Sequence, residues 1–503
     1  MSTLTKRLPR GATASATNAS APAPAASPAS YSLAVPRDLP AQLARTWLWL
    51  GLLALIGSGL FSVLLVVSRT PGLNQWLPLA DFFRVALVVH VDLSVLVWFI
   101  AMAGLLWSLI GTSGDGRVSR LAGRAAPALC AGGALLMSAA PFVERAEPIM
   151  ANYIPVLDGP VFLAGLVVFA LGTAVLVLRA LWLAPKLGWR FDGDGALRFG
   201  LNASVIATAV ALGAFVWSLA VVPPSLAGKA YYEILFWGGG HALQFTWTLL
   251  MLVAWLWLAD ACGARLRFSP RLALAMFALA LLAVFVTPVA YLAYDVASVE
   301  HRNLLTWAMR AGGGPAIVPI GLAVVLALRG AMPADAIQRP LRAALLTSVL
   351  LFGAGGLIGV FIQGSNVRIP AHYHGCIVGV TLALMGLVYH LLPRLGYGTP
   401  ASRIAAWQPW VYGIGQLMHI VGLVWSGGYG VQRKVAGAEQ VLRSSSEVAG
   451  MGLMGLGGAV AIVGGVLFIV GVIAALRDKR PAAAGGGRTH EAATNAEAAR
   501  EPA

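Results

Sequence analysis

Seven of the eight histidines lie within or beside long apolar stretches, and their positions along those stretches are the first sign of chemistry in this sequence. They are His90, His241, His301, His372, His374, His390 and His419, while His490 belongs to a polar C-terminal stretch. An imidazole inside a membrane is either a hydrogen-bonded packing residue, a proton carrier or a ligand to a metal. Four of the seven, His90, His241, His372 and His374, are expected at a similar depth in the outer part of a membrane.

The pair His372 and His374 carries the sharpest geometric constraint. Side chains two positions apart on an α-helix point about 200° apart around the helix axis. The two imidazoles therefore face opposite ways, which favours two large flat cofactors, such as haems, over one metal ion that needs converging ligands. His90 is available as a second axial ligand from another helix.

Simpler roles stay open for the other histidines. For His390 and His419, taken singly, packing or proton relay is the preferred interpretation. For His241, the preceding Gly238-Gly239-Gly240 indicate either close helix packing or the close approach of a flat ring.

The elements that position these residues are membrane spans. The chain has 503 residues, a mean hydropathy of +0.79, 58% hydrophobic residues and only 11% charged residues. This composition excludes an ordinary soluble fold and leaves no stretch for a separate catalytic domain. The apolar runs predict an all-α polytopic membrane protein with twelve transmembrane helices at about 46–68, 83–112, 123–142, 154–184, 199–224, 230–259, 271–296, 314–329, 341–363, 369–393, 403–427 and 449–476.

The basic residues predict how these spans are oriented. Of the 35 Lys and Arg, 25 lie in the two ends and in the loops after even-numbered spans, and 10 lie in the opposite loops. By the positive-inside rule, both termini are cytoplasmic in a bacterial-type plasma membrane, so the charge of +15 indicates no nucleic-acid partner. The chain is thus divided into a disordered cytoplasmic arm (1–40), a twelve-helix haem-binding membrane domain (41–480) and a disordered cytoplasmic tail (481–503).

Around the histidine pair, the sequence resembles subunit I of the haem-copper oxidase superfamily, which comprises terminal oxidases and bacterial nitric oxide reductases. The similarity is strongest from Ile369-Pro370-Ala371-His372-Tyr373-His374 through Tyr389-His390-Leu391-Leu392-Pro393 and covers about residues 45–476. The resemblance implies that His90 and His374 ligate a low-spin haem and that His372 ligates a high-spin haem. It further implies that Arg433 and Lys434 lie at the haem propionates, and that His241 ligates a second metal, copper or non-haem iron.

Two departures from the family pattern put that second metal in doubt. The family often has a tyrosine four residues after the helix-6 histidine, where this chain has Phe245. The family's adjacent helix-7 histidines align with Leu292 and Ala293, neither of which can bind a metal. A rebuilt site would have to recruit His301, with Glu300, Tyr294 and Asp295 as further polar neighbours at the outer end of the same helix.

Three functions remain from the sequence. The first is a respiratory reductase that passes electrons through the low-spin haem to the high-spin haem, where dioxygen or nitric oxide is reduced. The second is a dihaem electron carrier or gas sensor without the second metal, and the third is a transporter, a class in which twelve spans are common. The reductase implies an external donor subunit carrying haem c or a copper centre, because the chain lacks a CxxCH motif. Intramembrane acids that could carry protons are few: Asp92, Asp158 and Glu233.

Overall fold

The computed structural model describes residues 30–36, 38–73, 80–111, 116–184, 191–330, 334–400, 402–436 and 439–478. The predicted arm lies outside these ranges up to residue 29, and the predicted tail lies wholly outside them. Residues 30–36, near the end of the predicted arm, are packed onto the bundle. The Tyr31 side chain is fully buried, and its hydroxyl donates to the Phe268 carbonyl oxygen at 2.7 Å.

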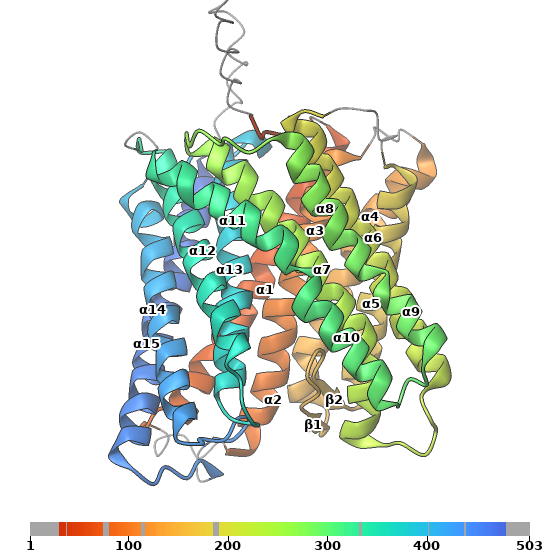
Figure 1. The fold of residues 1–503 in the computed structure, drawn as a ribbon, viewed down its shortest axis with the longest axis vertical. Coiled ribbons are helices and arrows are strands. Elements are labelled where there is room, and N and C mark those ends of the chain that lie inside the picture. Colours follow the sequence, from red (N-terminus) through yellow and green to blue (C-terminus); the bar gives the residue numbers. More distant parts are fainter. Residues whose placement is uncertain are drawn as a thin grey trace, which may run out of the picture.

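The described chain forms a bundle of long helices with one small hairpin at one end (Figure 1). The hairpin strands β1 (Glu147–Ile149) and β2 (Val156–Asp158) are antiparallel. In chain order the helices are α1 (Leu39–Arg69), α2 (Ala80–Val91), the π-helical η1 (Asp92–Val97), α3 (Trp98–Ile110), α4 (Arg117–Val143), α5 (Pro160–Trp182), α6 (Gly193–Val221), α7 (Gly228–Ala261), α8 (Pro270–Val284), α9 (Val286–Ala293), α10 (Val299–Gly312), α11 (Gly314–Arg329), α12 (Gln338–Val360), α13 (Arg368–Leu391), the 3₁₀ turn η2 (Pro393–Leu395), α14 (Arg403–Gly428) and α15 (Ser445–Arg477).

These elements form the twelve spans expected from the sequence. Eleven helical segments of the described chain are long and apolar enough to cross a membrane, with α2–η1–α3, α8–α9 and α10–α11 each counted as one. The twelfth is α14, whose apolar run is interrupted by Gln408, Gln416 and His419 but which packs lengthwise against α15. A helix of 26 residues is about 39 Å long, enough to span the bilayer.

Several helices begin six or seven residues before the predicted span, including α1, α4 and α6, and two other predicted starts are wrong for clear local reasons. The eighth span begins at Val299 instead of 314, because the Ser298 hydroxyl caps it by accepting from the His301 backbone N–H at 3.1 Å. His301 therefore lies at the start of this helix and not at the outer end of the seventh span. The fourth span begins at Pro160 instead of 154, because the residues before it form the hairpin.

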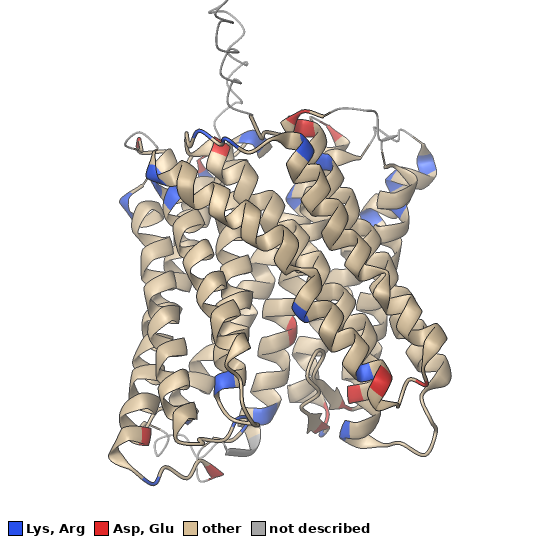
Figure 2. Cartoon of the chain, in the orientation of Figure 1, with Lys and Arg blue, Asp and Glu red and all other residues tan. Residues whose placement is uncertain are grey.

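Charged residues gather at the two ends of the bundle and leave a nearly uncharged band between them (Figure 2). A hydrocarbon layer about 30 Å thick requires such a band, because isolated charges are costly there. The chain is therefore a multi-pass membrane protein.

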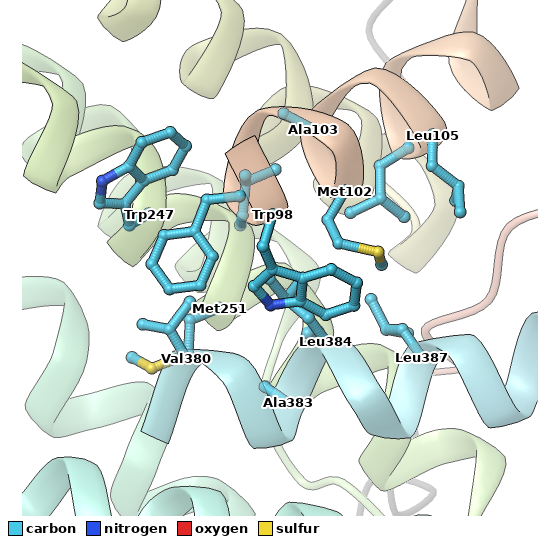
Figure 3. Packing of buried hydrophobic residues seen from close by; sticks show 14 of the residues in the cluster. Trp98, Met102, Ala103, Leu105, Trp247, Met251, Val380, Ala383, Leu384 and Leu387 are labelled. Atoms are coloured by element: carbon cyan, nitrogen blue, oxygen red, sulfur yellow. The ribbon is translucent and has the colours of Figure 1, made fainter. Parts of the chain in front are cut away.

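The helices that carry the informative histidines are also the most deeply buried. Among the spans, α7 and α13 have the largest buried share, followed by the α2–η1–α3 span. Trp98 on α3 points toward Ala383 and Leu384 on α13 (Figure 3). The helices α7 and α13 pack directly against each other, and Phe99 of α3 contacts Trp247 of α7 with ring centroids 5.1 Å apart. These contacts place His90, His241, His372 and His374 on one connected scaffold.

Candidate functional site

Four histidines share one hydrogen-bonding arrangement, in which the ring Nδ1 donates to a backbone carbonyl oxygen. The acceptors are Ser58 for His90 (3.0 Å), Trp237 for His241 (2.8 Å), Gly355 for His372 (2.7 Å) and Met454 for His419 (3.0 Å). A carbonyl oxygen can only accept, so Nδ1 carries the proton and Nε2 keeps its lone pair. Histidine commonly ligates a metal through Nε2 in this form, with a carbonyl fixing the ring.

His90 is held at the junction between α2 and the wider π-helical turn η1. The Ser58 hydroxyl lies 3.0 Å from His90 Nδ1, beside the Ser58 carbonyl. The Ser94 hydroxyl donates to the His90 carbonyl oxygen at 2.7 Å. These contacts from two elements orient the ring and leave Nε2 available to a ligand.

His374 has a close imidazole neighbour from another helix. The rings of His374 and His419 have centroids 4.6 Å apart and are tilted by 50°, and Gln416 is a hydrogen-bond partner of His374. His90 and Arg69 lie within electrostatic range of both imidazoles. The structure thus brings the two predicted low-spin ligands together and adds His419 to them.

The depth of His419 along its helix could have linked it to the other histidines, although no second histidine lies near it in the sequence. The helix α14 ends at Gly428, nine residues beyond His419. This spacing corresponds to about 14 Å along the helix, close to the depth expected for the other outer histidines. Depth, more than local sequence, is what places His419 with the candidate site.

His372 faces a different helix from His374, as the two-residue spacing predicts. Its Nδ1 bonds to Gly355 on α12, whereas His374 packs against α14. A Cβ on Gly359 would lie 2.7 Å from His372 Nδ1, so only glycine leaves room for the ring there. The side chains present fit one haem between His90 and His374 and a second haem on His372.

His241 differs from the others because its Nε2 is already occupied. Tyr153, from the hairpin between α4 and α5, has its hydroxyl 2.9 Å from His241 Nε2. The two rings have centroids 4.8 Å apart, and Trp237 packs on both of them. A Cβ on Gly240 would lie 2.2 Å from Tyr153 Cγ, so this glycine admits an aromatic ring.

The residues around His241 do not fit a second metal. The Leu292 side chain is 76% exposed on the outside of the bundle, and Ala293 is exposed beside it. In the described residues, no group of three or more His, Cys, Asp and Glu side chains is arranged to hold a metal ion. Bound transition metals normally have three or four protein ligands.

The His301 imidazole lies within electrostatic range of His241 but makes no hydrogen bond to the part of the chain that is described. It is fully buried, and both of its ring nitrogens lack a partner there. Its ring packs edge-on against Tyr291, with centroids 4.7 Å apart. The Tyr291 hydroxyl contacts the Ser218 hydroxyl at 2.6 Å.

Arg433 and Lys434 hold the hairpin that carries Tyr153. Arg433 Nη1 donates to the Asn152 side-chain oxygen at 3.4 Å, and Lys434 Nζ donates to the Met150 carbonyl oxygen at 2.6 Å. On the other side of the hairpin, Glu233 of α7 accepts from the backbone and side-chain N–H groups of Asn152. The hairpin is thereby tied both to α7 and to the loop after α14.

Burial changes the acid–base properties of this loop region. Burial lowers the pKa of Lys434 to about 8, with the charge of Arg433 adding to the effect and that of Glu233 opposing it. Burial, followed by the neighbouring Tyr373 and Glu233, raises the pKa of Tyr153 well above its ordinary value. The Tyr153 phenol is therefore neutral at physiological pH and can donate its proton to a hydrogen bond.

The other polar residues considered for the site make contacts only with nearby side chains, or none within the described residues. Asp158 accepts from the Tyr232 hydroxyl at 2.8 Å, and His390 packs edge-on against Trp257 beside Arg394. Asp92 is buried, and its Oδ2 has no hydrogen-bond partner among the described residues. No chain of hydrogen bonds in the described residues joins Asp92 to the histidines.

Comparison with known proteins places the chain in a family. Residues 42–467 match the family model described as cytochrome c and quinol oxidase polypeptide I. The chain belongs to this family. Membership in cytochrome c and quinol oxidase polypeptide I, together with the fold, implies a respiratory oxidoreductase.

Three relatives and one solved structure are similar to the chain over most of its length. The chain is 29% identical to an uncharacterised protein of Rickettsia prowazekii (strain Madrid E), covering 85% of this chain and 94% of that protein. It is 31% identical to an uncharacterised protein of Aquifex aeolicus (strain VF5), covering 72% and 88%. It is 26% identical to cytochrome c oxidase subunit 1 of Thermus thermophilus, covering 69% and 68%. A haem-copper terminal oxidase dimer solved by electron cryo-microscopy shares the fold, with a TM-score of 0.67 at 16% identity over 90% of this chain and 86% of that one.

Proposed function

We propose that the chain is a dihaem oxidoreductase of a respiratory chain, with a low-spin haem between His90 and His374 and a high-spin haem on His372. The observation that carries the proposal is the orientation of His90 and His372, whose Nδ1 atoms each donate to a backbone carbonyl oxygen and so leave Nε2 available to iron. When bound, the haems supply one-electron transfer at iron and, on His372, an open position for dioxygen or nitric oxide.

The protein's own residues would set the path and the environment. Placing His372 and His374 two positions apart on one buried helix keeps the two ligand positions close, so an electron has a short distance to cross α13. The apolar core around Trp98 and Met251 excludes water from this part of the bundle. Arg433 and Lys434, in the outer loop, supply the positive charge that haem propionates require.

The proposal is tested by the haem content of the purified chain, read with the carbon monoxide difference spectrum of the reduced protein. We expect two haems per chain, of which one binds carbon monoxide. A chain purified without haem, from cells that supply haem to other membrane proteins, would contradict the proposal.

A second function is favoured by one specific observation, the occupation of His241 Nε2 by Tyr153. A dihaem electron carrier or gas sensor needs no second metal and would tolerate this arrangement. His241→Ala separates the two functions. A reductase should lose its turnover of dioxygen or nitric oxide while keeping both haems, whereas a carrier should keep its rate of electron transfer.

The cellular setting follows from the charge distribution and forms part of the proposal. We place the chain in a bacterial plasma membrane with both termini cytoplasmic, and we expect a donor subunit with haem c or a copper centre at the outer face. Reporter fusions at Met1 and Ala503 test the orientation, since a periplasmic phosphatase should be inactive at both ends. Cross-linking from Lys229, an exposed residue at the outer end of α7, tests for the donor subunit.

A further inference from the structure

The hydrogen bonds of His241 leave no nitrogen free for a metal. The Trp237 carbonyl can only accept, so the bond of 2.8 Å fixes the proton on Nδ1. The Nε2 atom is then an acceptor, and the Tyr153 hydroxyl at 2.9 Å must be the donor. A metal ion at Nε2 would have to displace this phenol.

Packing and hydrogen bonds from two other parts of the chain hold Tyr153 in place. Gly240 provides the space for its ring, and Trp237 packs edge-on against it with centroids 5.7 Å apart. The preceding residue, Asn152, is held by Glu233 and Arg433. These contacts come from α7 and from the loop after α14. The position of the phenol is therefore fixed by contacts with other parts of the bundle.

The glycine run shows how closely this region is filled. Added Cβ atoms on Gly238, Gly239 and Gly240 would lie 2.2–2.3 Å from three different aromatic side chains, those of Tyr291, Phe215 and Tyr153. The three consecutive glycines face different directions, about 100° apart, so aromatic side chains surround this turn of α7.

The surrounding side chains supply no alternative ligand set. The Tyr291 hydroxyl is bonded to Ser218 and to the Ala214 carbonyl oxygen at 3.2 Å. His301 has unpartnered nitrogens, but its ring is packed against the Tyr291 ring. A single added imidazole would give two ligands, fewer than transition metals normally take.

We propose that this member of the family works without a second active-site metal, and that Tyr153 occupies the coordination position at His241 Nε2 as a phenol–imidazole pair. The inference rests on the proposed function only in placing this pair near the gas-binding haem. Tyr153 lies within electrostatic range of Tyr373, whose ring is 5.6 Å from that of His372. The site then offers a bound gas molecule one haem iron and a neutral polar pair, and no second metal ion.

Metal analysis of the purified chain tests the inference directly. From cells supplied with copper and iron, we expect iron equal to the haem content and no copper or further iron. One additional copper or iron per chain would overturn the proposal, and its loss in His301→Ala but not in a Leu292→Ala control would identify a rebuilt site. Absence of haem would contradict the proposed function instead, so the two failures are distinguishable.

A double-mutant cycle on thermal unfolding in detergent tests the pair itself and needs no bound cofactor. Tyr153→Phe keeps the ring but removes the donor, and we expect it to lower the Tm by roughly 1–3 °C. In a His241→Leu background the same change should have no effect, because the acceptor is already gone. Equal shifts in both backgrounds would overturn the hydrogen-bonded pair. Tyr232→Phe, which removes the bond to Asp158, is the matched control and should lower the Tm equally in both backgrounds.

Discussion

His374 and His419 lie ring against ring, with centroids 4.6 Å apart, although they come from different helices and lie 45 positions apart in the sequence. Their neighbours are His90 and Arg69, so three imidazoles gather where a haem with two axial ligands needs only two. The family motif assigns His374 as the axial ligand. In the structure, His419 lies close enough to His374 to be the alternative ligand.

Single substitutions of these two histidines distinguish ligand from neighbour. His374→Ala should abolish the low-spin haem spectrum, because His90 alone leaves one axial position unfilled. His419→Ala should retain the low-spin spectrum, since both axial ligands remain. The reduced-minus-oxidised absorption spectrum of each purified variant is the measurement. The opposite pattern would make His419 the ligand and His374 its neighbour.

Gly359 on α12 should be required for the high-spin haem. An alanine Cβ there would lie 2.7 Å from His372 Nδ1 and displace the ring from its carbonyl partner. We expect Gly359→Ala to weaken haem binding at His372 by roughly tenfold or more, the usual effect of disturbing a ligand's orienting contact. The low-spin spectrum should persist while carbon monoxide binding falls.

Gly356 provides the matched control on the same helix. A Cβ at Gly356 meets nothing within 4 Å, so Gly356→Ala should leave both haem signals at wild-type levels. Loss of carbon monoxide binding in both variants would mean that an added methyl group at either glycine disturbs this part of α12 and that the effect is not specific to His372.

Gly240→Ala should destabilise the protein by crowding Tyr153. The added Cβ would lie 2.2 Å from Tyr153 Cγ, a contact that only a shift of the hairpin can relieve. Overpacking of this kind costs about 1–3 kcal/mol. Gly213→Ala on α6, where a Cβ meets nothing within 4 Å, should instead be neutral or slightly stabilising, because alanine favours helix more than glycine does. Thermal unfolding of both variants in the same detergent makes the comparison.

The buried Lys434 should give the stability a dependence on alkaline pH. Its pKa is lowered to about 8 in the folded chain from an ordinary value of 10.5, so between these two pH values the unfolded chain binds more protons. Stability therefore rises with pH across this window, and the unfavourable contribution of the buried ammonium is fully present below pH 8.

The measurement is the Tm from pH 7 to pH 10.5 for the wild type and for Lys434→Gln. The wild type should gain stability relative to the variant as the pH rises from 8 to 10.5. Arg443→Gln removes a positive charge from an exposed residue in the loop between α14 and α15 and serves as the control. A constant difference between the wild type and Lys434→Gln over this range would contradict the lowered pKa.

Helical periodicity made part of the site predictable from the sequence. Apolar run lengths located the twelve spans, because a bilayer demands about 20 apolar residues per helix. The two-residue spacing of His372 and His374 determined that their rings face different neighbours, since the angle per residue on a helix is constant. The residue types Leu292 and Ala293 already excluded metal ligation at those positions.

Contacts between segments far apart in the sequence decided which side chains are paired at the candidate site. The pairing of Tyr153 with His241, and of His419 with His374, depends on which helices pack together and at what depth, and no local pattern encodes that. Arg433 and Lys434 bind the hairpin across more than 280 positions, a relationship that only the closed bundle creates. Local periodicity sets which way a side chain points along its own helix, whereas the partner that it meets is chosen by the packing of all twelve spans.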